Sequence, residues 1–124
     1  RGLENVFVNS NTYIIVATRG HRYDDLALAA AIRTPARYIG LLGSRRKTLE
    51  IYKNLLKEKV PMERLREVYA PIGLNIGAIT PEELAVSIMA EIIMVRNGGA
   101  GMSMKMNTAN LNTLMKHEEP DQAL

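Results

Sequence analysis

A glycine turn followed by three cations is the part of this sequence best suited to bind a ligand. Residues 38–47 read Tyr-Ile-Gly-Leu-Leu-Gly-Ser-Arg-Arg-Lys, which predicts a short buried strand, a turn and the start of a helix. Gly40 and Gly43 permit a tight reversal and the close approach of a ligand to the backbone, and Ser44 suits the helix N-cap. The cations that follow are Arg45, Arg46 and Lys47.

Three cations at the start of a helix call for a negative partner. A helix N-terminus already carries a partial positive charge, so a cation there is typically unfavourable by about 0.3–1 kcal/mol. An anion on the free amides reverses that sign. We therefore predict that residues 43–47, called the basic turn below, bind a phosphate-like anion. The alternative is a structural turn with solvated cations, because glycine and serine occur in many β–α turns and neither Gly-x-Gly-x-x-Gly nor a Walker loop is present.

The composition is that of one globular domain. The chain has 124 residues, of which 47% are hydrophobic and 23% charged, and no apolar run approaches the length of about 20 that spans a bilayer. With no cysteine it has no disulfide or thiolate metal site, and two distant histidines do not indicate a metal centre. A net charge of +3 with one Phe and no Trp gives little basis for nucleic-acid binding. We expect a cytoplasmic protein without a membrane or nucleic-acid partner.

Strand and helix patterns alternate along the first half. Residues 13–18 are β-branched and nearly all apolar, as in the middle of a parallel sheet. A helix capped by Asp24 or Asp25 follows, with the sheet-facing residues Leu26, Leu28, Ala29, Ala31 and Ile32. A second strand at about residues 37–42 leads to a helix over about 45–59. Its expected buried face is Leu49, Tyr52, Leu55 and Leu56. Residues 6–8 are either a short strand or the end of a preceding unit.

The second half continues the same alternation. Residues 62–67 predict a short helical piece, residues 68–70 a third parallel strand, and residues 71–78 a loop. Thr80, Pro81 and Glu83 then form a strong helix start with a capping box. That helix is expected to run to Arg96, end in left-handed geometry at residues 97–99, and be heavily buried because it is apolar around most of its circumference. Residues 98–106 are expected to be flexible and residues 110–117 to form a weak helix.

This alternation predicts where the polar loops lie. Strands joined by helices form a parallel sheet with right-handed crossovers, and ligands bind beyond the carboxyl ends of its strands. The loops expected at that edge are residues 18–22, 43–47 and 71–80. Their convergence favours the ligand-binding interpretation of the basic turn.

Several segments together resemble the carboxyl-terminal Rossmann domain of the XdhC/CoxI family, whose members are accessory factors of molybdenum hydroxylases such as xanthine dehydrogenase. They are residues 18–24 (Thr-Arg-Gly-His-Arg-Tyr-Asp), 36–47, 70–78 (Ala-Pro-Ile-Gly-Leu-Asn-Ile-Gly-Ala), 80–83 (Thr-Pro-Glu-Glu) and 90–93 (Ala-Glu-Ile-Ile). The resemblance implies a Rossmann-like three-layer αβα fold with a parallel sheet, of which this chain carries the C-terminal part. It places that domain at residues 12–98, after a lead-in at 1–11 from a missing upstream segment and before a flexible tail at 99–124.

The resemblance also implies a function. Such a protein binds molybdenum cofactor (molybdopterin) and delivers it to a molybdenum hydroxylase apoenzyme after a partner cysteine desulfurase has supplied sulfur. It is an accessory protein rather than an enzyme, in keeping with the absence of a nucleophile–base pair or paired carboxylates in the sequence. We expect a homodimer. The alternatives are an NAD(P)-dependent oxidoreductase domain and a non-catalytic assembly module.

The expected ligand-binding residues come from the three loops at the carboxyl edge. They are Arg19, Gly20, His21, Gly40, Gly43, Ser44, Arg45, Arg46, Lys47 and Gly73. His21 has an equally simple alternative role in hydrogen bonding its own loop. Glu91, an acid in an apolar helix, is expected to reach an arginine or a partner chain, with general acid catalysis as the less favoured interpretation. No catalytic or metal-binding residue is assigned.

Overall fold

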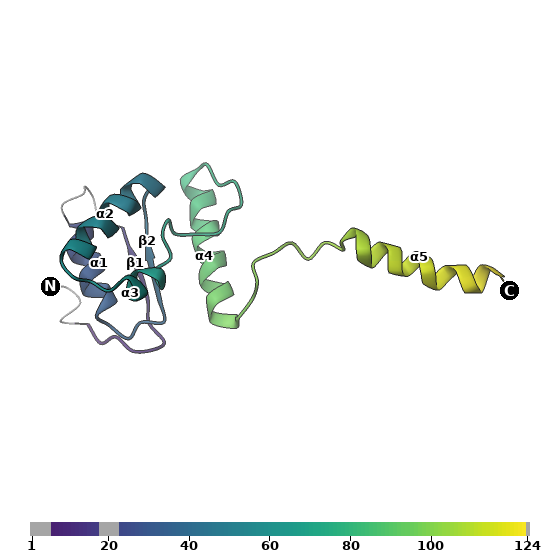
Figure 1. Cartoon of the computed structure of the whole chain (residues 1–124), viewed down its shortest axis with the longest axis horizontal. Coiled ribbons are helices and arrows are strands. Elements are labelled where there is room, and N and C mark those ends of the chain that lie inside the picture. The colour runs from purple at the N-terminus through teal and green to yellow at the C-terminus, as the bar shows by residue number, and fades with distance from the viewer. Residues whose placement is uncertain (1–5, 18–22, 124) are drawn as a thin grey trace.

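Parallel strands with helices on both sides form the body of the chain. The computed structural model describes residues 6–17 and 23–123, with side chains as far as residue 116. Helices α1 and α2 lie on one side of the strands and α4 lies on the other (Figure 1). The elements are β1 (Tyr13–Val16), α1 (Asp24–Ile32), β2 (Tyr38–Leu41), α2 (Arg45–Lys57), α3 (Met62–Arg66), α4 (Pro81–Asn97) and α5 (Thr108–Ala123).

The strands are parallel, as predicted. β1 and β2 pair with Tyr13 opposite Tyr38. The predicted third strand is reduced to one parallel bridge between Gly40 and Tyr69, in which the Tyr69 N–H donates to the Ile39 carbonyl at 2.9 Å. The position of a third parallel strand is therefore occupied, although only by a single bridge. The α/β architecture is confirmed, with a small sheet.

The main apolar core lies between the sheet and the α1–α2 layer. Alternate residues of β2 point to opposite faces, so Ile39 and Leu41 enter this core while Tyr38 faces α4. Asp24 is the first residue of α1 rather than its cap, and Leu26, expected to face the sheet, is exposed. The buried cluster consists of Val16, Leu28, Ala31, Ile32, Ile39, Leu41, Ile51, Leu55 and Leu65.

The buried face of α2 agrees only in part with the predicted one. Its buried residues are Thr48, Ile51 and Leu55, of which Leu55 was predicted. Of the residues predicted to be buried, Leu49 is instead 68% exposed. The helix carries two apolar stripes offset by one position, and neighbouring positions project about 100° apart. The sequence did not indicate which stripe the sheet would cover.

Both ends of α4 follow the prediction. The Thr80 side chain accepts a hydrogen bond from the Glu83 N–H, and the Glu83 side chain accepts from the Thr80 N–H, which completes the capping box. Pro81 occupies the first turn, and Gly98 closes the helix with a left-handed φ of 74°.

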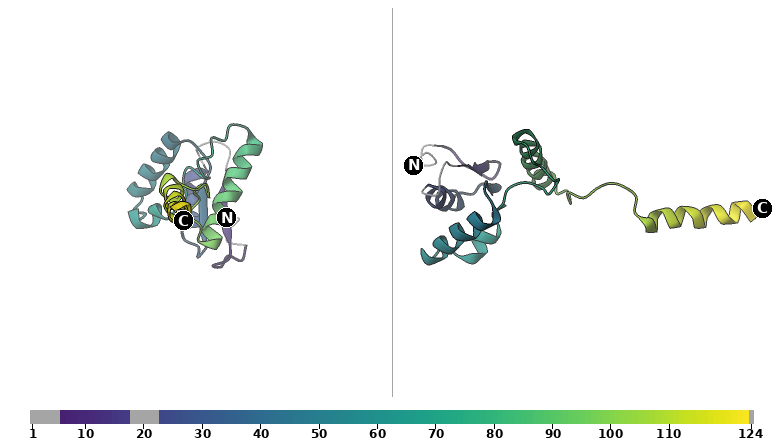
Figure 2. Two further views of the ribbon diagram at one scale, coloured as in Figure 1. Left: turned by 90° about the vertical axis from the view of Figure 1, so that its right-hand side faces the viewer. Right: turned by 90° about the horizontal axis from the view of Figure 1, so that it is seen from above.

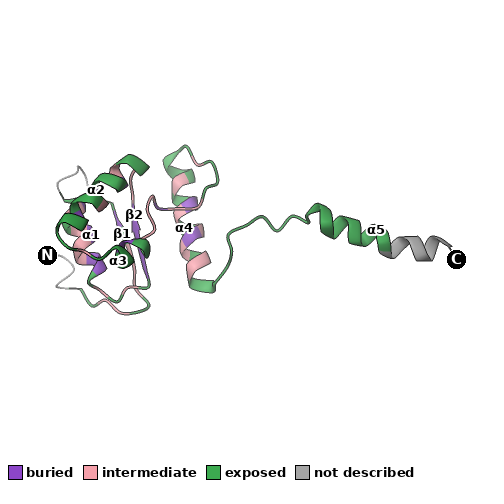
Figure 3. Cartoon of the chain, in the orientation of Figure 1, coloured by how far each residue is buried: buried purple, intermediate pink, exposed green. Residues whose placement is uncertain are grey.

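The prediction that α4 is heavily buried was wrong for the described chain. Its only buried residues are Ser87 and Glu91, both polar (Figure 3). Val86, Met89 and Ile93 are 60%, 53% and 45% exposed. The helix thus presents polar side chains to the sheet and an apolar stripe outward. A circumference rich in apolar residues does not indicate which side is covered.

The segment after α4 leads away from the body. Residues 98–107 form neither helix nor strand, and α5 projects outward in Figure 1 and in the right view of Figure 2. The Asn107 side chain accepts a hydrogen bond from the Asn110 N–H at 2.8 Å at the start of α5. This helix is longer than the one predicted at residues 110–117. At the other end, residues 6–8 form no strand.

Candidate functional site

The basic turn lies at the carboxyl edge of the sheet, as the sequence predicts. It follows β2 directly, and the Leu42 N–H continues the ladder by donating to the Val16 carbonyl at 2.9 Å. The loop that follows Tyr69 leaves the sheet at the same edge, because the strands are parallel. The third expected contributor, residues 18–22 with Arg19, Gly20 and His21, lies outside the described residues.

The turn has the backbone geometry that its sequence implies. Gly43 has a φ of 154°, a conformation that favours glycine, and a methyl group there would lie 3.0 Å from Lys47 Cδ. Ser44 is the N-cap of α2, and its Oγ accepts a hydrogen bond from the Lys47 N–H at 3.1 Å. Glycine and serine therefore set the start of the helix, whether or not a ligand binds.

The three cations of the basic turn have different environments. Lys47 Nζ lies 2.5 Å from Asp24 Oδ2, and the Asp24 side chain is fully buried. This acid, 23 positions earlier in the chain, supplies the negative partner of Lys47. Arg45 and Arg46 are exposed, and neither forms an ion pair with another described residue. Two guanidinium groups, rather than three cations, are thus available to an external anion.

A small cleft adjoins Arg45. It encloses about 230 Å³ between α2 and the loop after Tyr69. The Thr48 hydroxyl is buried and has no hydrogen-bond partner among the described residues, and burial raises the pKa of Tyr52. The sequence did not indicate this cleft. The helical spacing of Leu49 and Tyr52 was recognised, but both residues were assigned to the core. The lining residues are Arg45, Thr48, Leu49, Tyr52, Ala70 and Pro71.

Gly40 does not form the turn, which corrects the sequence interpretation. It lies inside β2, and a methyl group at this position would be 2.4 Å from Ile72 Cδ1 and 2.8 Å from the Tyr38 hydroxyl oxygen. Ile72 is itself buried. The close approach that requires glycine here is therefore made by a neighbouring side chain, not by a ligand.

Gly73 belongs to a polar seam that attaches α4 to the sheet. Its N–H donates to Glu91 Oε1 at 2.9 Å, and the Tyr38 hydroxyl donates to the same oxygen at 2.7 Å. The Ser87 hydroxyl donates to the Leu74 carbonyl at 2.6 Å. Glu91, which we expected to reach an arginine or a partner chain, instead accepts two hydrogen bonds from its own chain. The Gly73 amide is engaged by this carboxylate.

Three tyrosines line the same face of the sheet. The Tyr38 ring stacks on Tyr69 with centroids 4.8 Å apart, and Tyr13 lies 6.2 Å away on its other side. Burial, followed by the hydrogen bond and the charge of Glu91, raises the pKa of Tyr38 above its ordinary value of 10.0. Tyr38 is therefore a neutral donor to Glu91 at physiological pH.

The family model described as the XdhC Rossmann domain matches residues 3–92. The chain belongs to the XdhC family. The parallel α/β arrangement is accordingly of the Rossmann type, with a sheet that is incomplete in the described residues. The resemblance inferred from the sequence is confirmed.

The XdhC chain has bacterial relatives. "Uncharacterized protein YqeB" of Escherichia coli K12 is 36% identical over 99 residues, which are 80% of this chain and 18% of YqeB. A probable xanthine dehydrogenase subunit of Bacillus subtilis 168 is 43% identical over 82 residues, which are 66% of this chain and 23% of that protein. The chain thus spans about a fifth of the length of these curated relatives.

A solved structure has the same fold. The crystal structure of a xanthine dehydrogenase from Bacillus halodurans superposes with a TM-score of 0.64 at 30% sequence identity. The match covers 77% of this chain and 28% of that one. The XdhC domain therefore corresponds to one part of a larger protein in this neighbour as well.

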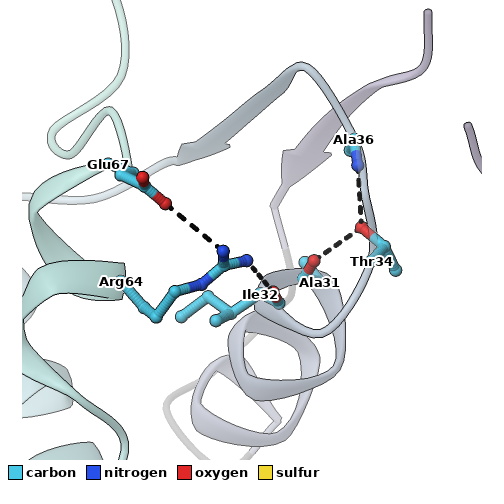
Figure 4. Close-up of polar contacts among 6 residues, drawn as sticks. All are labelled: Ala31, Ile32, Thr34, Ala36, Arg64 and Glu67. Atoms are coloured by element: carbon cyan, nitrogen blue, oxygen red, sulfur yellow. Dashed lines mark hydrogen bonds and ion pairs between the residues drawn. The ribbon is translucent and has the colours of Figure 1, made fainter. Parts of the chain in front are cut away.

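Another hollow of the XdhC domain lies at the opposite edge of the sheet. It measures about 420 Å³ and is bounded by residues 34–37, which precede β2, and by α3. Arg64 donates to the Ile32 carbonyl and lies 3.5 Å from Glu67 (Figure 4). Arg37 donates to the Arg96 carbonyl at 2.9 Å, at the end of α4. Both arginines of this hollow already bind acceptors of the chain, so the cleft beside Arg45 remains the better candidate for an anion.

Two further features of the XdhC chain bear on its chemistry. Within residues 6–17 and 23–116, no three His, Asp or Glu side chains are grouped so as to hold a metal ion. None of the helices in the described part of the chain has the length and apolar character needed to cross a membrane.

Proposed function

We propose that this XdhC domain is part of an accessory factor for molybdenum hydroxylases of the xanthine dehydrogenase type, and that it binds a phosphate-bearing cofactor at the basic turn. The observation that carries the proposal is the position of Arg45, which is exposed at the start of α2, at the carboxyl edge of a parallel sheet, and beside a cleft with an apolar wall. The Bacillus subtilis relative, named for xanthine dehydrogenase, favours the same class of target.

The residues around this cleft suit the cargo that we propose, which is molybdenum cofactor. Arg45 offers a planar fork for phosphate oxygens, and Leu49, Tyr52 and Pro71 offer flat apolar contact to a ring. The buried Thr48 hydroxyl has no partner among the described residues and lies in the same wall. A volume of about 230 Å³ accommodates only part of such a molecule, so the remainder extends over the edge of the sheet.

The partners in this proposal are those that the family resemblance implies. Sulfur for the cofactor is supplied by a cysteine desulfurase in the cytoplasm, and the 124-residue sequence contains no cysteine of its own that could carry a persulfide. The domain then transfers the cofactor to a molybdenum hydroxylase apoenzyme. NAD(P) binding at the same turn is the competing proposal, because a dinucleotide also presents phosphates.

Titration with isolated molybdenum cofactor, and separately with NAD⁺, tests the site. We expect saturable cofactor binding that is weakened at least about tenfold in Arg45→Ala, because a charge-assisted hydrogen bond typically contributes about 1.5–3 kcal/mol. Arg66→Ala is the matched control, since Arg66 is an exposed arginine on α3 outside the cleft. Equal affinity in the two variants would contradict the assignment of the basic turn. Tighter binding of NAD⁺ than of molybdenum cofactor would favour the oxidoreductase alternative.

A further inference from the structure

The outer face of α4 is an apolar stripe flanked by opposite charges. Successive helical residues project about 100° apart, which places six side chains within an arc of about 100° on the side opposite Glu91. The apolar members line a shallow groove of about 360 Å³ on the surface of the helix. We call this set the outer face, and it consists of Glu82, Ala85, Val86, Met89, Ile93 and Arg96.

We propose that α4 pairs antiparallel with α4 of a second copy of this chain across the outer face, with Met89 at the two-fold axis. Exposed apolar patches of this kind commonly mark interaction sites. Two copies of this helix laid antiparallel are complementary in both charge and side-chain size. The proposal concerns assembly and does not depend on cofactor binding.

The charges favour the antiparallel arrangement. Met89 is the middle residue of α4, seven positions from both Glu82 and Arg96. In an antiparallel pair centred there, Glu82 of one copy lies opposite Arg96 of the other, and the contact forms twice. A parallel pair would instead bring Glu82 to Glu82 and Arg96 to Arg96, and such like-charge contacts are unfavourable.

The sizes of the apolar side chains agree with the same register. Four positions before Met89 stands Ala85, and four positions after it stands Ile93. A small residue therefore lies opposite a large one at both ends of the apolar stripe, as close helix packing requires. An interface of this kind is isologous, because each copy contributes the same surface.

The other apolar helix of the chain fits the outer face less well. α5 carries Leu111, Leu114 and Met115 as an exposed stripe. Its acidic residues are Glu118, Glu119 and Asp121, but none stands 14 positions from a basic residue of the helix, which is the spacing of Glu82 and Arg96. The helix also lies away from α4 (Figure 2). A second copy of α4 supplies both charges in the required positions and is therefore the partner that we infer for the outer face.

The mass of the chain in solution, measured by light scattering across a dilution series, tests the proposal. We expect a dimer whose dissociation constant rises at least about tenfold in Met89→Asp, because two carboxylates would face each other in an apolar contact. Leu26→Asp is the matched control, since Leu26 is 68% exposed on α1, and it should leave the dimer intact. A monomeric chain at every concentration, or equal dissociation constants for the two variants, would overturn the proposal.

Charge reversal and cross-linking fix the register. Glu82→Arg and Arg96→Glu should each weaken the dimer, and the double variant should restore it. Because the sequence has no cysteine, Met89→Cys introduces the only thiol, which should form an intermolecular disulfide with its own copy. Glu82→Cys should cross-link with Arg96→Cys in a mixture but not with itself. Self-linking of Glu82→Cys, or a dimer that survives all these changes, would exclude the antiparallel pair.

Discussion

The Tyr38 hydroxyl donates a 2.7 Å hydrogen bond to Glu91 Oε1, across 53 positions of sequence. This contact joins β2 to α4, which covers the other side of the sheet. Glu91 accepts from the Gly73 N–H with the same oxygen, so one carboxylate holds together a strand, a loop and a helix. Glu91, an acid in an otherwise apolar helix, therefore serves as a hydrogen-bond acceptor that holds the fold together.

Replacing Tyr38 by phenylalanine should destabilise the fold. Tyr38→Phe removes one of the two donors to a buried carboxylate, and the expected loss in the free energy of unfolding is about 1.5–3 kcal/mol. Urea denaturation measures it. Tyr13→Phe is the control, because the Tyr13 hydroxyl forms no hydrogen bond to the other described residues and its loss should be small. Equal losses in the two variants would show that the bond to Glu91 contributes little.

The same tyrosine should make stability fall at alkaline pH. The folded-state pKa of Tyr38 is raised above 10.0, so its contribution is complete below that pH and is lost as pH rises toward the folded-state value. The free energy of unfolding should therefore decline above about pH 10, and less steeply in Tyr38→Phe. A parallel absorbance titration should show no ionisation of Tyr38 before unfolding. Identical slopes for the two proteins would contradict this assignment.

The ion pair behind the basic turn should be structural. Lys47→Met leaves the fully buried Asp24 carboxylate without its cation and should cost about 3 kcal/mol. Arg46→Met, one position earlier on an exposed side chain, should change stability by less than about 0.5 kcal/mol. Asp24→Asn in the Lys47→Met background should recover part of the loss. Chemical denaturation of the wild type, Lys47→Met, Asp24→Asn and the double variant gives the coupling energy of the pair. A Lys47→Met cost no larger than that of Arg46→Met would mean that the pair is unimportant.

Gly73 should tolerate no side chain. A methyl group there would lie 2.4 Å from Ser87 Oγ, on a backbone with a φ of 103°. Gly73→Ala should therefore cost more than Gly77→Ala, which has a φ of 75° but nothing within 4 Å of the added methyl. The second variant has backbone strain without a clash, so the difference between the two reports the clash with α4 together with the less favourable φ at residue 73. Similar unfolding free energies would indicate that α4 shifts freely to make room.

The sequence was sufficient where structure is set by neighbouring residues. The Thr80–Pro81–Glu83 start of α4 and its glycine end depend on a few adjacent positions, and both were predicted correctly. The same holds for Ser44 as the cap of α2. The strands β1 and β2 followed from short apolar runs, which mark strands covered on both sides, and their parallel pairing followed from the helix between them.

The sequence was insufficient where a partner comes from a distant segment. Nothing local to Lys47 indicates that a buried acid lies 23 positions earlier, and nothing local to Gly40 indicates that Ile72 fills the space beside it. The outward orientation of the apolar stripe on α4 was also missed. Burial of a helix face is decided by what packs against it, which amphipathic spacing alone does not specify.

The polar seam beneath α4 separates this helix from the main apolar cluster. The cluster draws its buried residues from β1, β2 and the first three helices, whereas the buried residues of α4 are a serine and a glutamate. Opening of α4 would expose these polar groups to water without opening the main apolar cluster. We therefore expect the amide protons of α4 to exchange with solvent before those of the strands do.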